Sequence, residues 1–89
     1  MPTQDTCIIN KLGLHARAAA KFANTANRFS STIEVSCGEK TINGKSIMSL
    51  MLLAASQGTA ISLSTTGKDA TEALEALLEL IANKFDEGE

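Results

Sequence analysis

The spacing of apolar residues constrains the fold of this chain most, because two different spacings alternate along it. Residues 31–37 (STIEVSC) and 60–67 (AISLSTTG) place apolar side chains at every second position, which is typical of strands with one buried face. The side chains that share these faces are Ile33, Val35 and Cys37 in the first run and Ile61, Leu63 and Thr65 in the second. We therefore predict two half-buried strands.

Two longer segments repeat their apolar residues every three or four positions, which is the spacing of a helix with one buried side. Residues 16–28 place Ala19, Phe22, Ala23 and Ala26 at this spacing. Residues 70–85, which follow Asp69, are predicted to form another such helix. Its apolar stripe is Leu74, Leu77, Leu78 and Ile81, opposite Glu72, Glu75 and Glu79.

A third helix is expected to begin after Ser46, which is a suitable N-cap, and to stop before Gly58. Its residues 47–54 are apolar on nearly every side, whereas a two-layer domain buries only one stripe of a helix. We expect Leu50, Leu53 and Ala54 to form the buried stripe. Ile47, Met48 and Met51 are then at least partly exposed, and a methionine-rich surface suits docking to several partners. The alternative is that this helix is buried more completely.

Two further strands complete the pattern, at residues 3–9 and 40–43, and the second lies at hairpin distance from residues 31–37. The predicted order is strand, helix, strand, strand, helix, strand, helix. One-sided helices together with alternating strands imply an α+β fold of two layers, with helices on one face of an antiparallel sheet. With 89 residues the chain suits a single domain, residues 1–89.

Composition excludes several classes of function. A formal net charge of −2 and 3% aromatic residues give no basis for nucleic-acid binding. Cys7 and Cys37 match no zinc or redox spacing, and we interpret both as reduced, although the sequence alone leaves a disulfide open. The N-terminal residues lack a signal-peptide pattern, and residues 47–55 are too short to cross a bilayer. We therefore expect a cytoplasmic protein without membrane insertion.

The residues NGKS, 43–46, are reminiscent of a phosphate-binding loop but fail its pattern. That loop needs a glycine five positions before Gly44, where this chain has Glu39, and Gly38 is one residue out of register. The segment also follows a weak strand in a domain too small for that fold. A structural turn is the better interpretation.

His15 is the only histidine, and it lies between Gly13 and an alanine-rich run, at the cap position of the first predicted helix. The first backbone N–H groups of that helix, those of Ala16, Arg17 and Ala18, have no acceptor within the helix. These donors and the positive end of the helix dipole form an anion site, to which Arg17 adds a charged donor. A nucleophile at such a site suits a phosphoryl acceptor. An ordinary capping histidine remains the alternative at this point.

Two segments resemble a known family. GLHARAAAKF (residues 13–22) resembles the phosphorylation-site signature of the HPr phosphocarriers of the bacterial phosphoenolpyruvate-dependent phosphotransferase system, and NGKSIMSLMLLAASQGT (residues 43–59) resembles their second block. The agreement extends almost end to end in length and element order. NKLGLHAR is also similar to the proteobacterial branch that includes the nitrogen-related paralogue NPr.

The resemblance implies an open-faced sandwich with sheet order 1-4-2-3 and a function as a carrier more than as an enzyme. It implies that His15 takes a phosphoryl group on Nδ1 from enzyme I, which phosphoenolpyruvate charges, and passes it to an enzyme IIA domain in sugar uptake or its regulation. Arg17 corresponds to the arginine that accompanies the phosphoryl group. Ser46 corresponds to the serine that HPr kinase/phosphorylase marks in some bacteria. Ile47, Met48 and Met51 correspond to the partner-facing side of the second helix. The resemblance implies no cofactor and no metal.

One position departs from the family pattern. Many members have proline at the third position after the histidine, where this chain has Ala18. Alanine loses the fixed φ of proline but supplies a backbone N–H. We expect the site to remain functional, with one more possible donor near the phosphate.

Alternatives remain open from the sequence. An NPr-like regulatory carrier would signal by its phosphorylation state without sugar transport. Ser46 has the alternative role of a cap that is never modified. A small metal or redox protein that uses Cys7, Cys37 and His15 is disfavoured by their spacing. Nothing in the sequence demands more than a monomer.

Overall fold

The computed structural model describes residues 3–9, 13–53 and 56–86. Within them the chain forms four strands, three α-helices and a short 3-10 helix, in the predicted order. These elements are β1 (Thr3–Cys7), α1 (Ala16–Ala26), β2 (Thr32–Cys37), β3 (Lys40–Asn43), α2 (Ile47–Leu53), β4 (Ala60–Thr66), α3 (Ala70–Ala82) and η1 (Lys84–Asp86).

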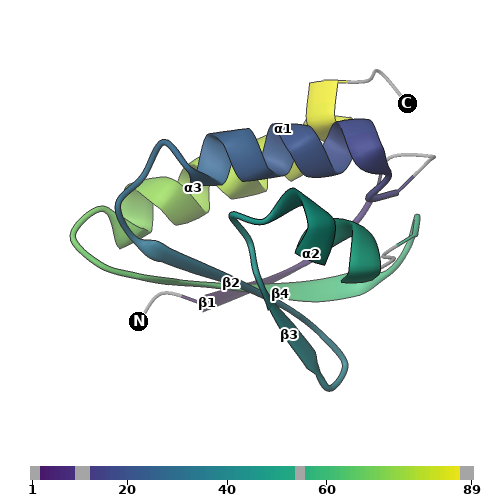
Figure 1. Cartoon of the computed structure of the whole chain (residues 1–89), viewed down its shortest axis with the longest axis horizontal. Helices are drawn as coiled ribbons and strands as arrows, with labels where there is room; N and C mark the ends of the chain where they lie inside the picture. The colour runs from purple at the N-terminus through teal and green to yellow at the C-terminus, as the bar shows by residue number, and fades with distance from the viewer. Residues whose placement is uncertain (1–2, 10–12, 54–55, 87–89) are drawn as a thin grey trace.

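The four strands form one antiparallel sheet in the order β1-β4-β2-β3, and the helices gather on one side of it (Figure 1). The predicted α+β class and sheet order are therefore confirmed. Val35 pairs with Leu63 and Ile33 with Thr65, and all four side chains are buried. The period-two pattern thus identified the inner face of both central strands, including the polar Thr65, whose hydroxyl donates to the Ala70 carbonyl at 2.8 Å.

The strand bounds agree with the prediction to within one residue except at β1, which ends at Cys7 and not at residue 9. Ile8 is nevertheless fully buried, and its backbone continues to pair beside β4. The Ile8 N–H donates to the Thr59 carbonyl at 3.0 Å, and the Gly58 N–H donates to the Ile8 carbonyl at 2.7 Å. These contacts hold the chain on its way from the sheet toward α1.

Helix α1 buries all four residues of its predicted stripe, and Ala18 as well. It ends at Ala26, two residues before the predicted end. Asn27 is its C-cap, because both the backbone N–H and the side-chain Nδ2 of Asn27 donate to the Ala23 carbonyl, at 2.9 and 2.8 Å. In α2, Leu50 and Leu53 are buried as predicted, whereas Ala54 lies outside the described residues.

The buried face of α3 differs from the prediction. Leu77 and Ile81 are buried, but Leu74 and Leu78 are only half-buried, and Ala70 and Ala73 take the inner positions. Small side chains at these positions let the helix backbone lie close to its neighbours, and the two leucines then cover the flank of the core.

The predicted helix over 70–85 also ends early, at Ala82. Lys84 and Phe85 have φ of 54° and 55°, in the left-handed region, so the helical path is broken there. This turn inserts the Phe85 side chain, which is fully buried, into the core. Burial of the phenyl ring contributes about 1.5–3 kcal/mol, which offsets part of the cost of two non-glycine residues with left-handed backbone.

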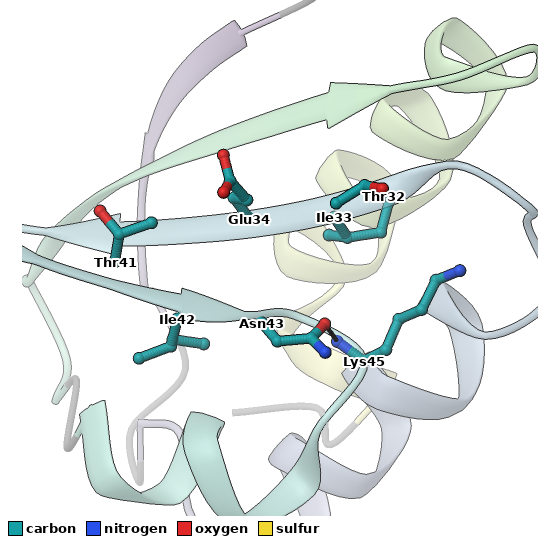
Figure 2. Close-up of a pocket in the computed structure, with 7 residues that line it drawn as sticks. All are labelled: Thr32, Ile33, Glu34, Thr41, Ile42, Asn43 and Lys45. Carbon is teal, nitrogen blue, oxygen red and sulfur yellow. Dashed lines mark hydrogen bonds between the residues drawn. The ribbon is translucent and has the colours of Figure 1, made fainter.

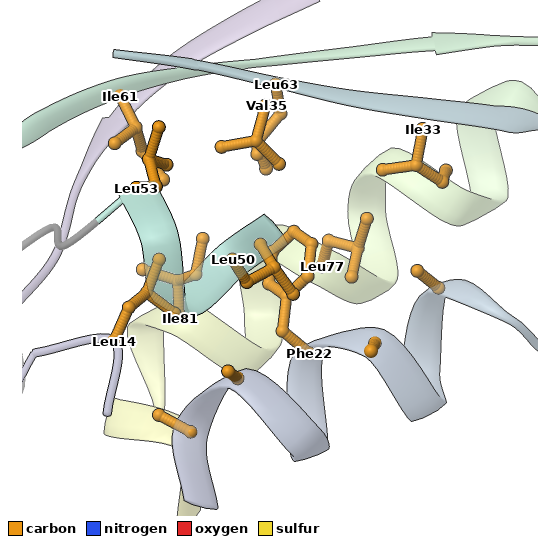
Figure 3. Close-up of a cluster of buried hydrophobic side chains, with 14 of the residues drawn as sticks. Leu14, Phe22, Ile33, Val35, Leu50, Leu53, Ile61, Leu63, Leu77 and Ile81 are labelled. Atoms are coloured by element: carbon orange, nitrogen blue, oxygen red, sulfur yellow. The ribbon is translucent and has the colours of Figure 1, made fainter. Parts of the chain in front are cut away.

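The core lies between the sheet and the helix layer and is built from both (Figure 3). Figure 3 shows the Phe22 ring pointing from α1 into the middle of the cluster. Gly44, between β3 and α2, is packed directly against this core. A Cβ atom on Gly44 would lie 2.6 Å from Ile33 Cγ2 and 3.2 Å from Phe22 Cε1, so no larger residue fits. The start of α2 is thereby held close to α1 and β2.

Asp69 joins the start of α3 to the loop that follows α1. Its carboxylate accepts hydrogen bonds from the Ser30 N–H at 2.9 Å, from the Ser31 N–H at 3.0 Å and from the Ser31 hydroxyl. The Ser31 hydroxyl foremost, and then the Ser30 N–H, lower the pKa of Asp69 from 3.8 to about 2. The ionised form of Asp69 therefore stabilises the fold.

This shift predicts a dependence of stability on pH. Because the pKa is lower in the folded chain, the contribution of Asp69 is complete above about pH 4 and is lost as the pH falls toward about 2. Urea unfolding of the wild type and of Asp69→Asn, measured across this range, is expected to show a stability difference that shrinks as the pH falls. A difference that stays constant between pH 4 and pH 2 would contradict the role given to the carboxylate.

Candidate functional site

The backbone before α1 places His15 at the start of that helix. Gly13 has a φ of 68°, in the left-handed region that glycine tolerates, and it turns the chain toward α1. Leu14 is buried and anchors this turn in the core. His15 follows as the N-cap, with extended backbone angles (φ −80°, ψ −178°) and a partly exposed side chain. The predicted cap position is confirmed.

The imidazole of His15 faces the first turn of α1. Its Nδ1 atom accepts a hydrogen bond from the Arg17 N–H at 3.3 Å, and the His15 carbonyl accepts the first helical bond, from the Ala19 N–H at 2.8 Å. Because Nδ1 is the acceptor, its lone pair is directed toward the helix N-terminus in this arrangement. An atom bonded to Nδ1 would therefore be held beside the positive end of the helix dipole.

The surroundings of this atom suit an anion. The first turn of α1 contains no acidic residue. The N–H groups of Ala16, Arg17 and Ala18 precede the first residue whose N–H bonds within the helix, so they have no intrahelical acceptor. Arg17 is exposed, which leaves its guanidinium access to a group on His15. His15 and Arg17, predicted to act together, are therefore neighbours in the fold.

The second predicted feature, α2, exposes most of its apolar residues. The exposed fractions are 42% for Ile47, 73% for Met48 and 46% for Met51, as predicted. Leu52, which is 71% exposed, belongs to the same group, although it was not among the residues predicted to be exposed. We call these four side chains the α2 apolar patch. The alternative of a fully buried helix is wrong.

Ser46 caps α2, because its hydroxyl accepts a hydrogen bond from the Ser49 N–H at 3.2 Å. Ser46 lies near the C-terminal end of α1. The side chain of Asn27, the C-cap of α1, donates a hydrogen bond to the carbonyl of Lys45, which is the residue before Ser46. Helix α1 has 11 residues, a length of about 16 Å, and His15 is at its other end (Figure 1). A group on Ser46 would therefore lie beside α2 and would not contact His15.

Other candidate chemistry finds no support in the described residues. Cys7 and Cys37 are free thiols, on strands that β4 separates. Among the described residues there is no group of three histidine, cysteine or acidic side chains placed to hold a metal ion. The same part of the chain contains no helix long and apolar enough to cross a membrane. The NGKS segment forms the end of β3, the Gly44 turn and the cap of α2, as its structural interpretation predicts.

The comparison with known families identifies the chain. The family model described as PTS HPr component phosphorylation site matches residues 2–83. The chain belongs to the HPr family of phosphocarrier proteins. The phosphocarrier protein HPr of Pseudomonas putida is 53% identical over 90 residues, with the whole of both chains covered. The phosphocarrier protein NPr of Shewanella violacea is 45% identical over 80 residues, which covers 90% of this chain and 88% of NPr.

The fold comparison agrees with this assignment. The crystal structure of HPr-C-His from Thermoanaerobacter tengcongensis superimposes with a TM-score of 0.95, at 49% identity and with 98% of each chain covered. A TM-score of this size over nearly the full length means that the HPr-family fold is retained in all its elements. The resemblance stated for residues 13–22 and 43–59 is therefore confirmed at the level of the family and of the phosphotransferase system.

Proposed function

We propose that this chain accepts a phosphoryl group from phospho-enzyme I on Nδ1 of His15 and passes it to an enzyme IIA domain. The phosphoryl group originates in phosphoenolpyruvate, and the bond between Nδ1 and phosphorus forms as the bond to the donor breaks. The observation that carries the proposal is the direction of Nδ1. Its lone pair faces the N-terminus of α1, and Nδ1 lies 3.3 Å from the Arg17 backbone nitrogen. A nucleophile beside an anion site is what this transfer needs.

Each residue of the site has a distinct task in this proposal. His15 is the acceptor, and the backbone N–H groups of Ala16, Arg17 and Ala18 bind the phosphoryl oxygens. The helix fixes these donors before the transfer, and the Arg17 N–H exchanges its hydrogen bond to Nδ1 for one to a phosphoryl oxygen as the bond to phosphorus forms. The Arg17 guanidinium adds a charged donor to the same oxygens. The imidazole attacks phosphorus with the Nδ1 lone pair. The proposal includes no cofactor.

The α2 apolar patch is the docking surface in this proposal. Its four side chains are 42–73% exposed, on a helix that packs beside α1. Methionine adapts to differently shaped partners, which suits a carrier that must meet a donor and several acceptors in turn. A partner seated on Ile47, Met48 and Met51 would also reach the exposed side of α1.

Intact-mass spectrometry tests this function. Incubation with enzyme I, magnesium and phosphoenolpyruvate is expected to add one phosphoryl group, which mild acid removes. A purified enzyme IIA domain added afterwards is expected to strip the group from the chain. An enzyme I that charges another HPr and leaves this chain unmodified would overturn the proposal.

The similarity to HPr favours the carbohydrate branch over the NPr-like alternative. The Pseudomonas putida HPr is more similar, and over more of the chain, than the Shewanella violacea NPr. In this branch the chain acts in the cytoplasm as a monomer in sugar uptake or its regulation. Transfer to a sugar-specific IIA domain at a higher kcat/KM than to a nitrogen-branch IIA domain is the expected result. The reverse preference would assign the chain to the other branch.

Phosphorylation of Ser46 by HPr kinase/phosphorylase is the regulatory part of the proposal. A phosphoserine places about −1.5 to −2 charges beside the α2 apolar patch, where an acidic or apolar partner is disfavoured. Because Ser46 and His15 lie at opposite ends of α1, docking is weakened and the transfer step itself is unchanged.

Ser46→Asp imitates this charge and is expected to raise the KM of the chain as a substrate of enzyme I about tenfold, with kcat unchanged. Steady-state transfer from enzyme I measures both constants. The matched control is Ser46→Asn, which retains a capping side chain without the charge. Equal KM values for the two variants would argue against regulation by phosphorylation of Ser46.

A further inference from the structure

Lys45, the residue before the α2 cap, forms hydrogen bonds through its backbone N–H, its carbonyl and its side-chain Nζ. Its N–H donates to Asn43 Oδ1 at 2.9 Å, and its carbonyl accepts from Asn27 Nδ2 at 3.1 Å. Its Nζ donates to the Phe29 carbonyl at 2.8 Å. Asn27 and Phe29 belong to the end of α1 and to the loop after it, so one residue joins that loop to the start of α2.

Asn27 completes the connection from the other side. Its Nδ2 group donates both to the Lys45 carbonyl and, at 2.8 Å, to the Ala23 carbonyl in the last turn of α1. An amide nitrogen carries two hydrogens, so both bonds form at once. Hydrogen bonds thus lead from α1 through Asn27 to Lys45, and the chain continues directly into the Ser46 cap.

The loop that receives these bonds is itself fixed. Ser30 and Ser31, just after Phe29, are held by the Asp69 carboxylate. Gly44, just before Lys45, is pressed against Ile33 and Phe22. By contrast, the described part of α2 has 7 residues, of which Leu50 and Leu53 are buried. A helix of this length depends on its ends for its position, because its own hydrogen bonds are few.

We propose that Lys45 and Asn27 form a latch that sets the position of α2 against α1, and thereby shapes the joint surface on which phosphoryl donors and acceptors dock. The inference rests on the proposed function, which needs both helices in one interface. Lys45 is then a positioning residue for docking. It touches neither the phosphoryl group nor the reacting nitrogen.

The direction of the Lys45 side chain distinguishes this role from that of a surface charge. In Figure 2 the side chain runs away from α2 toward the loop after α1, and it lines a shallow hollow beside Thr32 and Asn43. Its Nζ is already bonded to the Phe29 carbonyl. A cation that attracts an acidic partner to α2 would be expected to extend over the exposed face of that helix.

Two single variants and their combination test the latch. Lys45→Met removes the bond to Phe29. Asn27→Ala removes the bond to Lys45, together with the side-chain bond to the Ala23 carbonyl, without any change of charge. Each is expected to raise the KM for enzyme I about threefold, since the loss of one hydrogen bond lowers the population of the docking arrangement. We expect kcat to stay unchanged. The double variant is expected to raise KM more than either single variant, because the two changes remove different hydrogen bonds between Lys45 and the end of α1.

Salt separates the latch from simple charge attraction. The KM effect of Lys45→Met is expected to persist at high ionic strength, where surface charges are screened. Lys40→Met, which removes the same charge from an exposed position in β3, is the matched control and is expected to leave KM at high salt unchanged. An effect of Lys45→Met that salt abolishes, or that Asn27→Ala does not share, would overturn the latch.

Hydrogen exchange tests the latch without any partner protein. The Ser49 and Leu50 amides bond to the Ser46 hydroxyl and carbonyl, at 3.2 and 3.1 Å, and report on the start of α2. Both are expected to exchange about threefold faster in Lys45→Met and in Asn27→Ala. Unchanged exchange would overturn the latch even if enzyme I charges the chain. Faster exchange in a chain that enzyme I never charges would support the latch and reject the proposed function.

Discussion

Replacement of His15 with alanine is expected to abolish phosphoryl uptake from enzyme I while the fold stays intact. The side chain is partly exposed, and the hydrogen bond that it accepts from the Arg17 N–H is long, at 3.3 Å. Loss of an N-cap costs on the order of 1 kcal/mol, which a folded domain of this size tolerates. Loss of the attacking nitrogen removes the covalent step itself, so uptake is expected to fall by at least about a thousandfold.

The variant His15→Asn makes the test stricter. Asparagine is a preferred N-cap and offers a side-chain oxygen to the Arg17 N–H, yet it has no nitrogen lone pair able to attack phosphorus. It is expected to unfold at the same urea concentration as the wild type, or a higher one, and to remain unmodified by intact mass. A phosphorylated His15→Asn chain would place the acceptor elsewhere and reduce His15 to a helix cap.

The position of His15 could be predicted because it depends on local signals. A glycine turn, a capping position and an alanine-rich run lie within a few residues of each other, and the structure reproduces all of them. Ser46 as the cap of α2 follows from the same kind of signal. The exposure of Met48 follows from a simple restriction, namely that a two-layer fold buries only one stripe of a short helix.

What the sequence could not predict depends on contacts between distant segments. Asp69 meets Ser31 across 38 positions of the chain, and Asn27 meets Lys45 across 18, with no local pattern to indicate either pair. The predicted inner face of α3 was confirmed only at Leu77 and Ile81, because close packing places Ala70 and Ala73 at the other inner positions in place of leucine. The turn at Phe85 contains no glycine that would indicate it in the sequence, although it places the ring in the core.

Replacement of Phe22 with alanine is expected to have the largest effect on stability. The ring is 1% exposed and points from α1 into the core, close to the packed turn at Gly44. Removal of a buried phenyl group costs about 3–5 kcal/mol, because the transfer energy is lost and a cavity remains. That is a large share of the stability expected for a domain of about 90 residues, which is roughly 5–15 kcal/mol. Urea unfolding followed by far-UV circular dichroism measures the loss.

Comparison with Phe22→Leu and with His15→Asn shows whether Phe22→Ala affects stability alone. Phe22→Leu keeps most of the apolar volume and is expected to cost about 1.5 kcal/mol, so the difference between the two variants measures the cost of the additional apolar volume that alanine removes. Phe22→Ala should still accept a phosphoryl group in the molecules that remain folded, because the ring lies in the core whereas the imidazole of His15 lies at the partly exposed start of α1. His15→Asn is expected to show the opposite behaviour, namely a stable chain that takes up no phosphoryl group. A Phe22→Ala chain that is as stable as the wild type would mean that the core does not close around this ring, and the close approach of the Gly44 turn to α1 would lose its explanation.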